Sequence, residues 1–297
     1  ELFDPKNLSL KACASMSQAR AHHQAIKLPG GKVLVAGGAG PGGEGAGYYL
    51  SSCELYNPDL NTWSSAGSMN TPSADHRLVL LDDGRVLRVG GSTLSGFGTT
   101  TCEIYDPAAD SWALTGSLSV GRHSAGVAKL GNGQVIAAGG YMFTSAVEVF
   151  NPATETWTRV GNLAGPVAGP GAIPLNDGRA LLMGGEYWAG THTHPAAVSV
   201  YTPGTGLVTN GPPMLVGKAY FEPVLLPDGD VLVIGGASGG ANYCSTNACD
   251  RFDAATQTWE PAPSLNQGRH LSAAVFTQGK VFVIGGIDVH PGITVPL

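Results

Sequence analysis

The sequence predicts an all-β protein built from repeated four-stranded antiparallel sheets, and three observations lead to this prediction. Of the 297 residues, 44 are Gly and 20 are Pro. This composition disfavours long helices, because each interior Gly costs a helix about 1 kcal/mol and each Pro about 3 kcal/mol. Gly-Gly pairs recur at intervals near 50 residues, and an aromatic motif and a tight-turn motif recur with the same period. Hydrophobic residues make up 43% of the chain, which is enough to fill a core.

The Gly-Gly pairs each close a short apolar run that is rich in β-branched residues, as in KVLVAGG at 32–38 and KVFVIGG at 280–286. Successive pairs are 53, 49, 45, 51 and 50 residues apart. A turn containing Gly, usually with Asn or Asp, precedes each run, as in LDDGR at 81–85, and such residues accept the positive φ of a tight hairpin. Strands A and B of each repeat are therefore predicted to form a hairpin. The pairs begin at Gly37, Gly90, Gly139, Gly184, Gly235 and Gly285.

The aromatic motif is a Tyr or Phe, usually followed by Asn or Asp and then Pro, with a Trp seven residues after the aromatic residue. It predicts strand C, a short turn and strand D, so that each repeat forms one four-stranded sheet. The intact copies are Tyr56 with Trp63, Tyr105 with Trp112, Phe150 with Trp157, and Phe252 with Trp259. The degenerate copies are Tyr201 with Val208 and Phe3 with Leu10.

These combined motifs resemble the kelch repeat, and the resemblance covers essentially the whole chain. It implies a β-propeller, in which four-stranded blades surround a central channel. Residues 1–16 align without gaps with 54–69, so we expect strands C and D of the closing blade at 1–16 and its strands A and B at 268–286. Six Gly-Gly pairs and six aromatic motifs then predict a single six-bladed domain over 1–297, with 287–297 as the loop that joins the halves of the closing blade.

The charge pattern excludes several classes of partner. Only 13% of the residues are charged, the net charge is −6, and Lys and Arg do not cluster, which argues against a nucleic-acid partner. No apolar run approaches the ~20 residues that span a bilayer, so no membrane insertion is expected. We expect a monomer or a module of a larger protein. Low charge, abundant Gly, Ser and Thr, and the disulfide that Cys244 and Cys249 could form favour an extracellular or periplasmic location.

Residues that the repeat does not explain gather on one predicted face, which the D-to-A connections and B-to-C loops build. They include six Tyr, one Trp and all eight His. Aromatic side chains supply contact area and imidazoles supply hydrogen bonds or proton transfer, so this face is predicted to bind a ligand. The alternative is structural: Arg-His pairs bracing neighbouring blades, and tyrosines packing within long loops. The predicted ligand-binding residues are Tyr48, Tyr49, His76, Arg77, Arg122, His123, Tyr141, Tyr187, Trp188, Tyr243 and His270.

Two stretches also suggest chemistry on this face. In EYWAGTHTHPA, His192 and His194 alternate by two and would point the same way on an extended segment, so with Glu186 they could hold a metal ion, although no other cofactor is predicted. An ordinary polar loop is the alternative. In the fifth repeat an acid, a base and a phenol replace the usual Arg and His region near the channel mouth. The candidate catalytic residues are Lys218, Tyr220 and Glu222, together with His23 and Arg20.

These features favour a binding platform that recognises a protein or glycan ligand through the loop face. The alternative is an enzyme with an acid-base or metal site at the channel mouth, similar to a six-bladed sugar mutarotase or another carbohydrate-active enzyme. The repeats also resemble the central domain of galactose oxidase, which has seven blades, a copper ion and a Tyr-Cys cross-link. No Tyr-Cys pair here matches that cross-link, so copper-radical oxidation is not expected.

Overall fold

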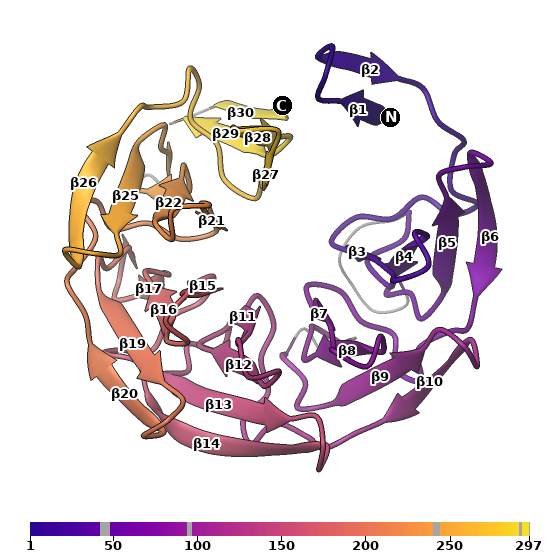
Figure 1. The fold of residues 1–297 in the computed structure, drawn as a ribbon, viewed down its shortest axis with the longest axis horizontal. Coiled ribbons are helices and arrows are strands. Elements are labelled where there is room, and N and C mark those ends of the chain that lie inside the picture. The colour runs from indigo at the N-terminus through magenta and orange to yellow at the C-terminus, as the bar shows by residue number, and fades with distance from the viewer. Residues whose placement is uncertain (42–47, 94–96, 240–243, 291–292, 297) are drawn as a thin grey trace. The chain divides into compact units, whose positions relative to one another are not determined.

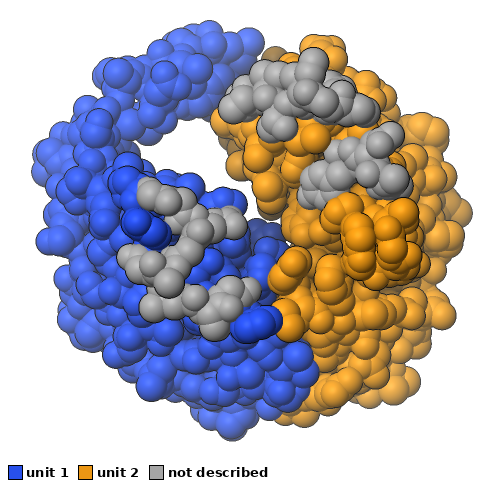
Figure 2. Space-filling view, turned by 180° about the vertical axis from the view of Figure 1, so that it is seen from behind, with its two compact units in different colours: residues 1–124, 150–157 blue, residues 125–149, 158–297 orange. Residues whose placement is uncertain are grey.

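The computed structural model describes residues 1–41, 48–93, 97–239, 244–290 and 293–296. The chain divides into two compact units, which Figure 2 colours separately: unit 1 contains residues 1–124 and 150–157, and unit 2 contains residues 125–149 and 158–297. The regular elements in the described residues are β-strands, as the composition predicts. None of the described segments is a helix of the length and apolarity needed to cross a membrane.

Unit 1 contains two complete four-stranded antiparallel sheets and one terminal hairpin. In both sheets the strands follow in sequence order, so each strand pairs with the next one along the chain. The hairpin is β1 (Leu2–Asp4) and β2 (Ser9–Lys11). The first sheet is β3 (Gln24–Lys27), β4 (Val33–Ala36), β5 (Cys53–Asn57) and β6 (Thr62–Ala66). The second is β7 (Arg77–Leu80), β8 (Val86–Val89), β9 (Cys102–Asp106) and β10 (Ser111–Leu114).

Unit 2 contains two sheets with the same strand order, shown side by side in Figure 1. We call the first the fourth sheet: β15 (Gly171–Pro174), β16 (Ala180–Met183), β19 (Val198–Thr202) and β20 (Leu207–Asn210). We call the second the fifth sheet: β21 (Glu222–Leu225), β22 (Val231–Ile234), β25 (Cys249–Asp253) and β26 (Thr258–Ala262). The hairpin β27 (Ala273–Thr277) and β28 (Lys280–Ile284) follows.

A further sheet, which we call the third, has the order β11 (Gly126–Lys129), β12 (Val135–Ala138), β13 (Ala146–Asn151) and β14 (Thr156–Asn162). The boundary between the units runs through β13 and β14. The predicted pattern of strands A to D is thus confirmed in five sheets. The joining of β1–β2 and β27–β28 into one closing blade stays a prediction, as does the number of blades.

The aromatic motif acts as a packing unit, as its spacing predicts. Tyr56 and Trp63 occupy paired positions on β5 and β6, and their ring centroids lie 5.0 Å apart. The indole Nε1 of Trp63 donates to the carbonyl of Ala14, 49 residues earlier, so this side chain also ties its sheet to the preceding repeat. Trp112 and Trp259 make the same kind of bond to Gly67 and Pro212.

Two loops and the C-terminal segment contain strands that the sequence did not predict. The B-to-C loops of unit 2 carry the small hairpins β17 (Tyr187–Trp188) with β18 (His192–Thr193) and β23 (Ala237–Ser238) with β24 (Cys244–Ser245). The segment expected as a joining loop instead forms β29 (Ile287–His290) and β30 (Ile293–Pro296). Its Ile, Val and Thr residues favour a paired strand over an open loop, which corrects that expectation.

The cysteines differ in part from their prediction. Cys53, Cys102 and Cys249 do occupy the same strand position and are buried, and burial raises the pKa of the Cys53 thiol to about 11. No disulfide joins Cys244 to Cys249 in the described part of the chain. The Cys249 Sγ contacts the carbonyl of Asn247 at 3.7 Å instead, because its side chain packs inward from β25 into the core.

Candidate ligand-binding site

A buried carboxylate in unit 2 is the centre of the candidate site. Glu186 directly follows the Gly-Gly pair that ends β16, and its backbone exchanges two hydrogen bonds of 2.8 Å with Ala168. Its side chain is 7% exposed. Oε1 accepts a 2.8 Å hydrogen bond from the Tyr220 hydroxyl, while Oε2 lies 3.3 Å from His192 Nδ1 and 3.6 Å from His194 Nε2. We call Glu186, Tyr220, His192 and His194 the Glu186 cluster.

The tyrosine of this cluster reaches Glu186 because of an unusual backbone position and a glycine. Tyr220 has a φ of +51°, and its amide donates a 2.9 Å hydrogen bond to the carbonyl of Gly169 in the preceding repeat. A Cβ atom on Gly169 would lie 2.4 Å from the tyrosine ring, closer than real atoms approach. The absence of a side chain at 169 therefore lets the ring pass over this residue to the carboxylate.

The surroundings of Glu186 keep it ionised. Burial raises the pKa of this carboxyl, but the contacts with His194 and Tyr220 and the charges of both imidazoles outweigh burial and hold the pKa below its ordinary value of 4.5. The negative charge of Glu186 also acts on His270. Burial lowers the pKa of His270, whereas the charges of Glu186 and Asp288 raise it. The cluster therefore presents a hydrogen-bond acceptor with a negative charge.

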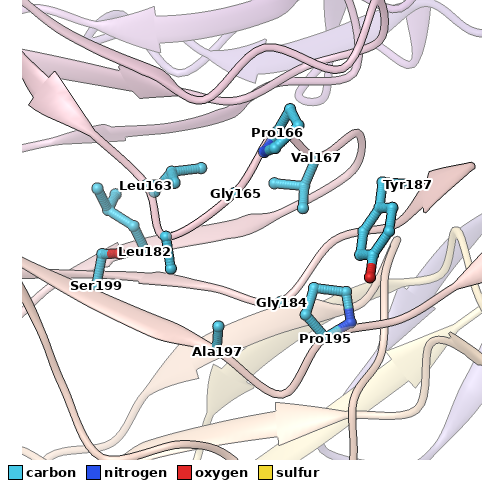
Figure 3. A pocket seen from close by; sticks show the side chains of 11 residues that line it. Leu163, Gly165, Pro166, Val167, Leu182, Gly184, Tyr187, Pro195, Ala197 and Ser199 are labelled. Carbon is cyan, nitrogen blue, oxygen red and sulfur yellow. The ribbon is translucent and has the colours of Figure 1, made fainter. Parts of the chain in front are cut away.

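Two aromatic side chains flank the cluster on the β17–β18 hairpin. Trp188 is 58% exposed, and its ring meets the His192 imidazole edge to face with centroids 4.9 Å apart. Tyr187 is half-buried and lines a neighbouring cavity, which Figure 3 shows. The paired register Trp188↔His192 fixes the indole next to the imidazole that contacts Glu186. An exposed indole thus lies two residues after a buried carboxylate, at the start of one hairpin.

Unit 1 carries a related polar group at the same backbone position. Asp75 and His22 both have a left-handed φ, of +51° and +54°, and the Asp75 amide donates to the His22 carbonyl as Tyr220 does to Gly169. The side chains meet through His22 Nδ1 and Asp75 Oδ1 at 3.0 Å. Burial raises the pKa of Asp75, but the His22 hydrogen bond and the charges of three imidazoles lower it below its ordinary value.

Several predicted ligand-binding residues lie inside the protein rather than on a face. His76, Arg122 and His270 are at most 3% exposed, and burial lowers the pKa of His76 to about 3. Their burial gives no support to direct contact with a ligand, so their ligand-binding role stays a prediction. His270 Nδ1 lies 2.9 Å from the Ser245 hydroxyl.

The remaining predicted ligand-binding residues are accessible to different degrees. Tyr48 and Tyr141 are exposed, and the Tyr141 ring lies 5.4 Å from that of Phe143. Tyr243 lies outside the described residues. Half-buried residues complete the set: Tyr49, Arg77 and His123, of which His123 contacts the Ser124 hydroxyl at 3.2 Å.

Two of the candidate catalytic residues, Arg20 and Lys218, are buried and held by ion pairs. The Arg20 side chain is fully buried and donates to the carbonyls of Gly37 and Ser52 and to Glu54, so it braces its own sheet. Lys218 is also fully buried, with Nζ 3.3 Å from Asp250 and 3.0 Å from the Ala248 carbonyl. The geometry therefore gives no support to a catalytic role for either residue, and that role stays a prediction. Of the predicted Lys-Tyr-Glu set, Tyr220 contacts Glu186.

The other two candidates lie on or next to strands. Glu222 is half-buried at the start of β21, paired in register with Ile234. His23 is half-buried before β3, where burial and the nearby Arg20 charge lower its pKa.

The predicted metal ligands do meet, through ion-pair contacts of 3.3 and 3.6 Å between the Glu186 carboxylate and the two imidazoles. Glu186, His192 and His194 converge on one carboxylate oxygen, as their spacing predicts. In the described ranges, no set of three His, Cys, Asp or Glu side chains is placed to hold a metal ion. The metal site therefore gains no support from the geometry and stays a prediction.

Two features of the site escaped the sequence reasoning. The left-handed position that carries Tyr220 and Asp75 has no sequence signature, since Tyr and Asp occur there as well as Gly169. The cavity beside Tyr187 had a signal in the repeat alignment. Two residues before the aromatic residue of the motif, strand C has an acidic residue in the other complete sheets, but Ser199 in the fourth sheet.

Comparison with known proteins identifies the repeat and the fold. Residues 122–164 match the family model of the kelch motif. The chain therefore carries the kelch motif that its sequence resembles, and its four-stranded antiparallel sheets are those of a kelch-type β-propeller. A search of curated proteins found no match.

Two solved structures share this fold at low sequence identity. One is described as the structure of YjhT, with 15% identity, a TM-score of 0.68, and coverage of 85% of this chain and 87% of that chain. The other is a fungal alcohol oxidase of the AA5 family in complex with copper, with 19% identity and a TM-score of 0.73. That match covers 90% of this chain but 58% of the oxidase chain.

Proposed function

We propose that this chain is a binding platform for a glycan, with its site at Trp188 and the Glu186 cluster. The exposed indole of Trp188 beside a buried, ionised carboxylate is the observation that carries the proposal. A sugar ring has apolar C–H faces and a rim of hydroxyl donors. An aromatic face supplies contact area at little entropic cost, while a carboxylate accepts hydroxyl hydrogen bonds.

The polar residues of the Glu186 cluster are held in place by one another, which supports a role in binding a ligand. Glu186 is held by Tyr220 and faced by two imidazoles, so its position is set before a ligand arrives. Preorganised groups lose less entropy on binding than mobile ones. The hairpin register then places the indole at a fixed distance from these acceptors and donors.

Titration calorimetry with a panel of neutral tetrasaccharides, including those of glucose and of N-acetylglucosamine, tests this proposal. We expect the native chain to bind at least one of them and Trp188→Ala to weaken that binding at least tenfold. Leu207→Ala is the matched control, because Leu207 is in the same unit and is also 58% exposed, but lies on β20. Equal binding by the Trp188→Ala chain would contradict the proposed site, and so would capture of proteins with no tetrasaccharide bound.

An acid-base enzyme is the second candidate function, and the 2.8 Å bond between Tyr220 and Glu186 favours it. A phenol and a carboxylate in contact are the groups that proton transfer to and from a sugar oxygen requires. Nuclear magnetic resonance of a bound tetrasaccharide would reveal anomeric interconversion or bond cleavage. Turnover that is lost in Tyr220→Phe while binding persists supports the enzyme, and binding without any chemical change supports the platform alone.

A further inference from the structure

A buried ion pair recurs in the first, second and fifth sheets. In the first sheet Arg20, which precedes the Ala21↔Ala39 bridge, donates to Glu54 on β5 at 2.8 Å. In the second sheet the cation comes instead from β8, where Arg88 lies 2.7 Å from Glu103, its partner in register. In the fifth sheet Lys218, at the position of Arg20, lies 3.3 Å from Asp250.

The fourth sheet lacks every charged member of this pair. Val167 precedes the Ala168↔Glu186 bridge and so occupies the position of Arg20 and Lys218. Leu182 and Ser199 are partners in register and occupy the positions of Arg88 and Glu103. All three are at most 4% exposed. Two apolar residues and a small hydroxyl thus replace two long charged side chains.

A cavity of about 470 Å³ lies at this place, and Figure 3 shows its lining. Val167, Leu182 and Ser199 all line it, together with Leu163 from the connection before β15 and Tyr187 from β17. No Lys, Arg, His, Asp or Glu is among its lining residues. Leu163, Leu182 and Ser199 lie at one end in the figure and Tyr187 at the other. The volume falls within the range of roughly 300 to 1,000 Å³ that small-molecule sites occupy.

In the first and second sheets the carboxylate of the ion pair also accepts from two backbone amides. In the first sheet Glu54 accepts hydrogen bonds from the amides of Ser17 and Gln18, three and two residues before Arg20. In the second sheet Glu103 accepts from the amides of Asn70 and Thr71 in the same way. In the fourth sheet the equivalent amides belong to the residues three and two positions before Val167. They are the exposed Ala164 and the half-buried Gly165, which line the cavity, and neither amide donates a hydrogen bond to another of the described residues.

We propose that this cavity binds an uncharged small molecule whose acyl carbonyl accepts from the amides of Ala164 and Gly165 and whose hydrocarbon part contacts Val167 and Leu182. A carbonyl oxygen supplies the acceptor that Glu54 and Glu103 supply elsewhere. A carboxylate ligand is disfavoured, since a buried charge without a cation is costly and none lines the cavity. This site is separate from the glycan site and does not rest on it.

Ligand titrations followed by the ¹H and ¹⁵N shifts of Ala164 and Gly165 test the proposal, with acetophenone as the probe. Toluene keeps the ring but lacks the acceptor, and benzoate replaces the ketone by a charge. We expect acetophenone to bind and move both amide signals, and each of the other two to bind at least tenfold more weakly. No binding of acetophenone, or equal or tighter binding of toluene or benzoate, would overturn the proposal.

Variants that fill the cavity separate it from other sites. Val167→Arg with Ser199→Glu installs the pair that other sheets carry and should abolish acetophenone binding. Ser199→Leu fills the same space without charge and decides the question if the double variant fails to fold. Trp188→Ala is the control and should bind acetophenone as the native chain does. Persistent binding in either folded, cavity-filled variant would refute the assignment, and loss of binding in Trp188→Ala would place the probe at the other site.

Discussion

The fourth and fifth sheets of unit 2 have the same strand order and register but opposite interiors. In the fifth sheet a fully buried Lys218 pairs with Asp250, whereas the fourth sheet has Val167 and Ser199 at these positions and a cavity beside them. The comparison teaches that the hydrogen-bonded scaffold of the repeat does not depend on the ion pair. A buried pair can be exchanged for apolar residues at little cost, and here the exchange leaves usable space.

The two sheets also differ at a second position, where the fourth sheet has the smaller residue and the fifth sheet has the larger one. Gly169 of the fourth sheet and Tyr220 of the fifth both adopt a left-handed φ, of +60° and +51°, just after the bridged alanines. The bare glycine leaves room for the tyrosine ring to reach Glu186. The site thus depends on two adjacent repeats being different at one position.

The largest effect is expected when half of the fifth sheet's ion pair is removed. Asp250→Ala leaves the buried Lys218 charge unpaired and should destabilise the protein by about 3–5 kcal/mol in urea unfolding. Lys218→Val with Asp250→Ser copies the fourth sheet and leaves no unpaired charge, so it should cost less than Asp250→Ala alone. A double variant at least as unstable as the single one would break the comparison.

Two neighbouring leucines on β16 sharpen the comparison further. Leu181 is fully buried in a hydrophobic core cluster and does not line the cavity, whereas Leu182 is almost as buried but lines it. Truncation of a buried leucine to alanine costs about 2–5 kcal/mol, depending on the contacts that are lost. We expect Leu181→Ala near the upper limit and Leu182→Ala near the lower, because Leu182 already lacks neighbours on one side. Equal losses in chemical denaturation would argue against an open cavity.

A smaller effect is expected from Tyr220→Phe, which removes the hydroxyl that bonds Glu186. A hydrogen bond to a charged group contributes about 1.5–3 kcal/mol, so stability near neutral pH should fall by that amount. The pKa of Glu186 should also rise toward 4.5, since the tyrosine hydroxyl is one of the groups that lower it. A titration of the carboxyl by nuclear magnetic resonance measures this shift directly.

The same variant has a defined pH dependence. The folded pKa of Glu186 is below its ordinary value of 4.5, so its stabilising contribution is present above that pH and is lost as the pH falls through the folded pKa. The stability difference between native and Tyr220→Phe chains should therefore shrink in acid. A difference that stays constant from pH 7 to below the folded pKa would contradict the assigned role of the hydroxyl.

The smallest effect is expected at the surface of the fourth sheet and its hairpin. Trp188→Ala and Leu207→Ala each remove a side chain that is 58% exposed, so each should change the unfolding free energy by no more than about 0.5 kcal/mol. The two variants should differ in glycan binding alone. A large loss of stability in Trp188→Ala would make the indole a structural residue.

Much of the fold could be predicted because its determinants are local. The Gly-Gly pairs, the tight turns and the aromatic motif each act within one repeat, and Tyr56 pairs with Trp63 as their spacing requires. The small hairpin β17–β18 and the strands β29 and β30 were not predicted, because they lie in segments that do not repeat.

The candidate site was predicted only in part for the same reason. The sequence grouped Glu186, His192 and His194, which lie close along the chain and do meet. It placed Tyr220 with Lys218 and Glu222, whereas the fold turns the tyrosine toward a carboxylate 34 residues earlier. It also offered the buried His76 and Arg122 as surface residues, since sequence position does not reveal burial.

The sequence by itself determined the repeat, the order of strands within each sheet and the kelch motif, because these follow from residue spacing and turn chemistry. Only the tertiary structure decided which polar side chains meet and where space remains. The contact of Tyr220 with Glu186 requires the bare Gly169 in the adjacent repeat, and the cavity requires Val167, Leu182 and Ser199 to face one another. Such properties arise from packing between distant segments, and no single segment contains them.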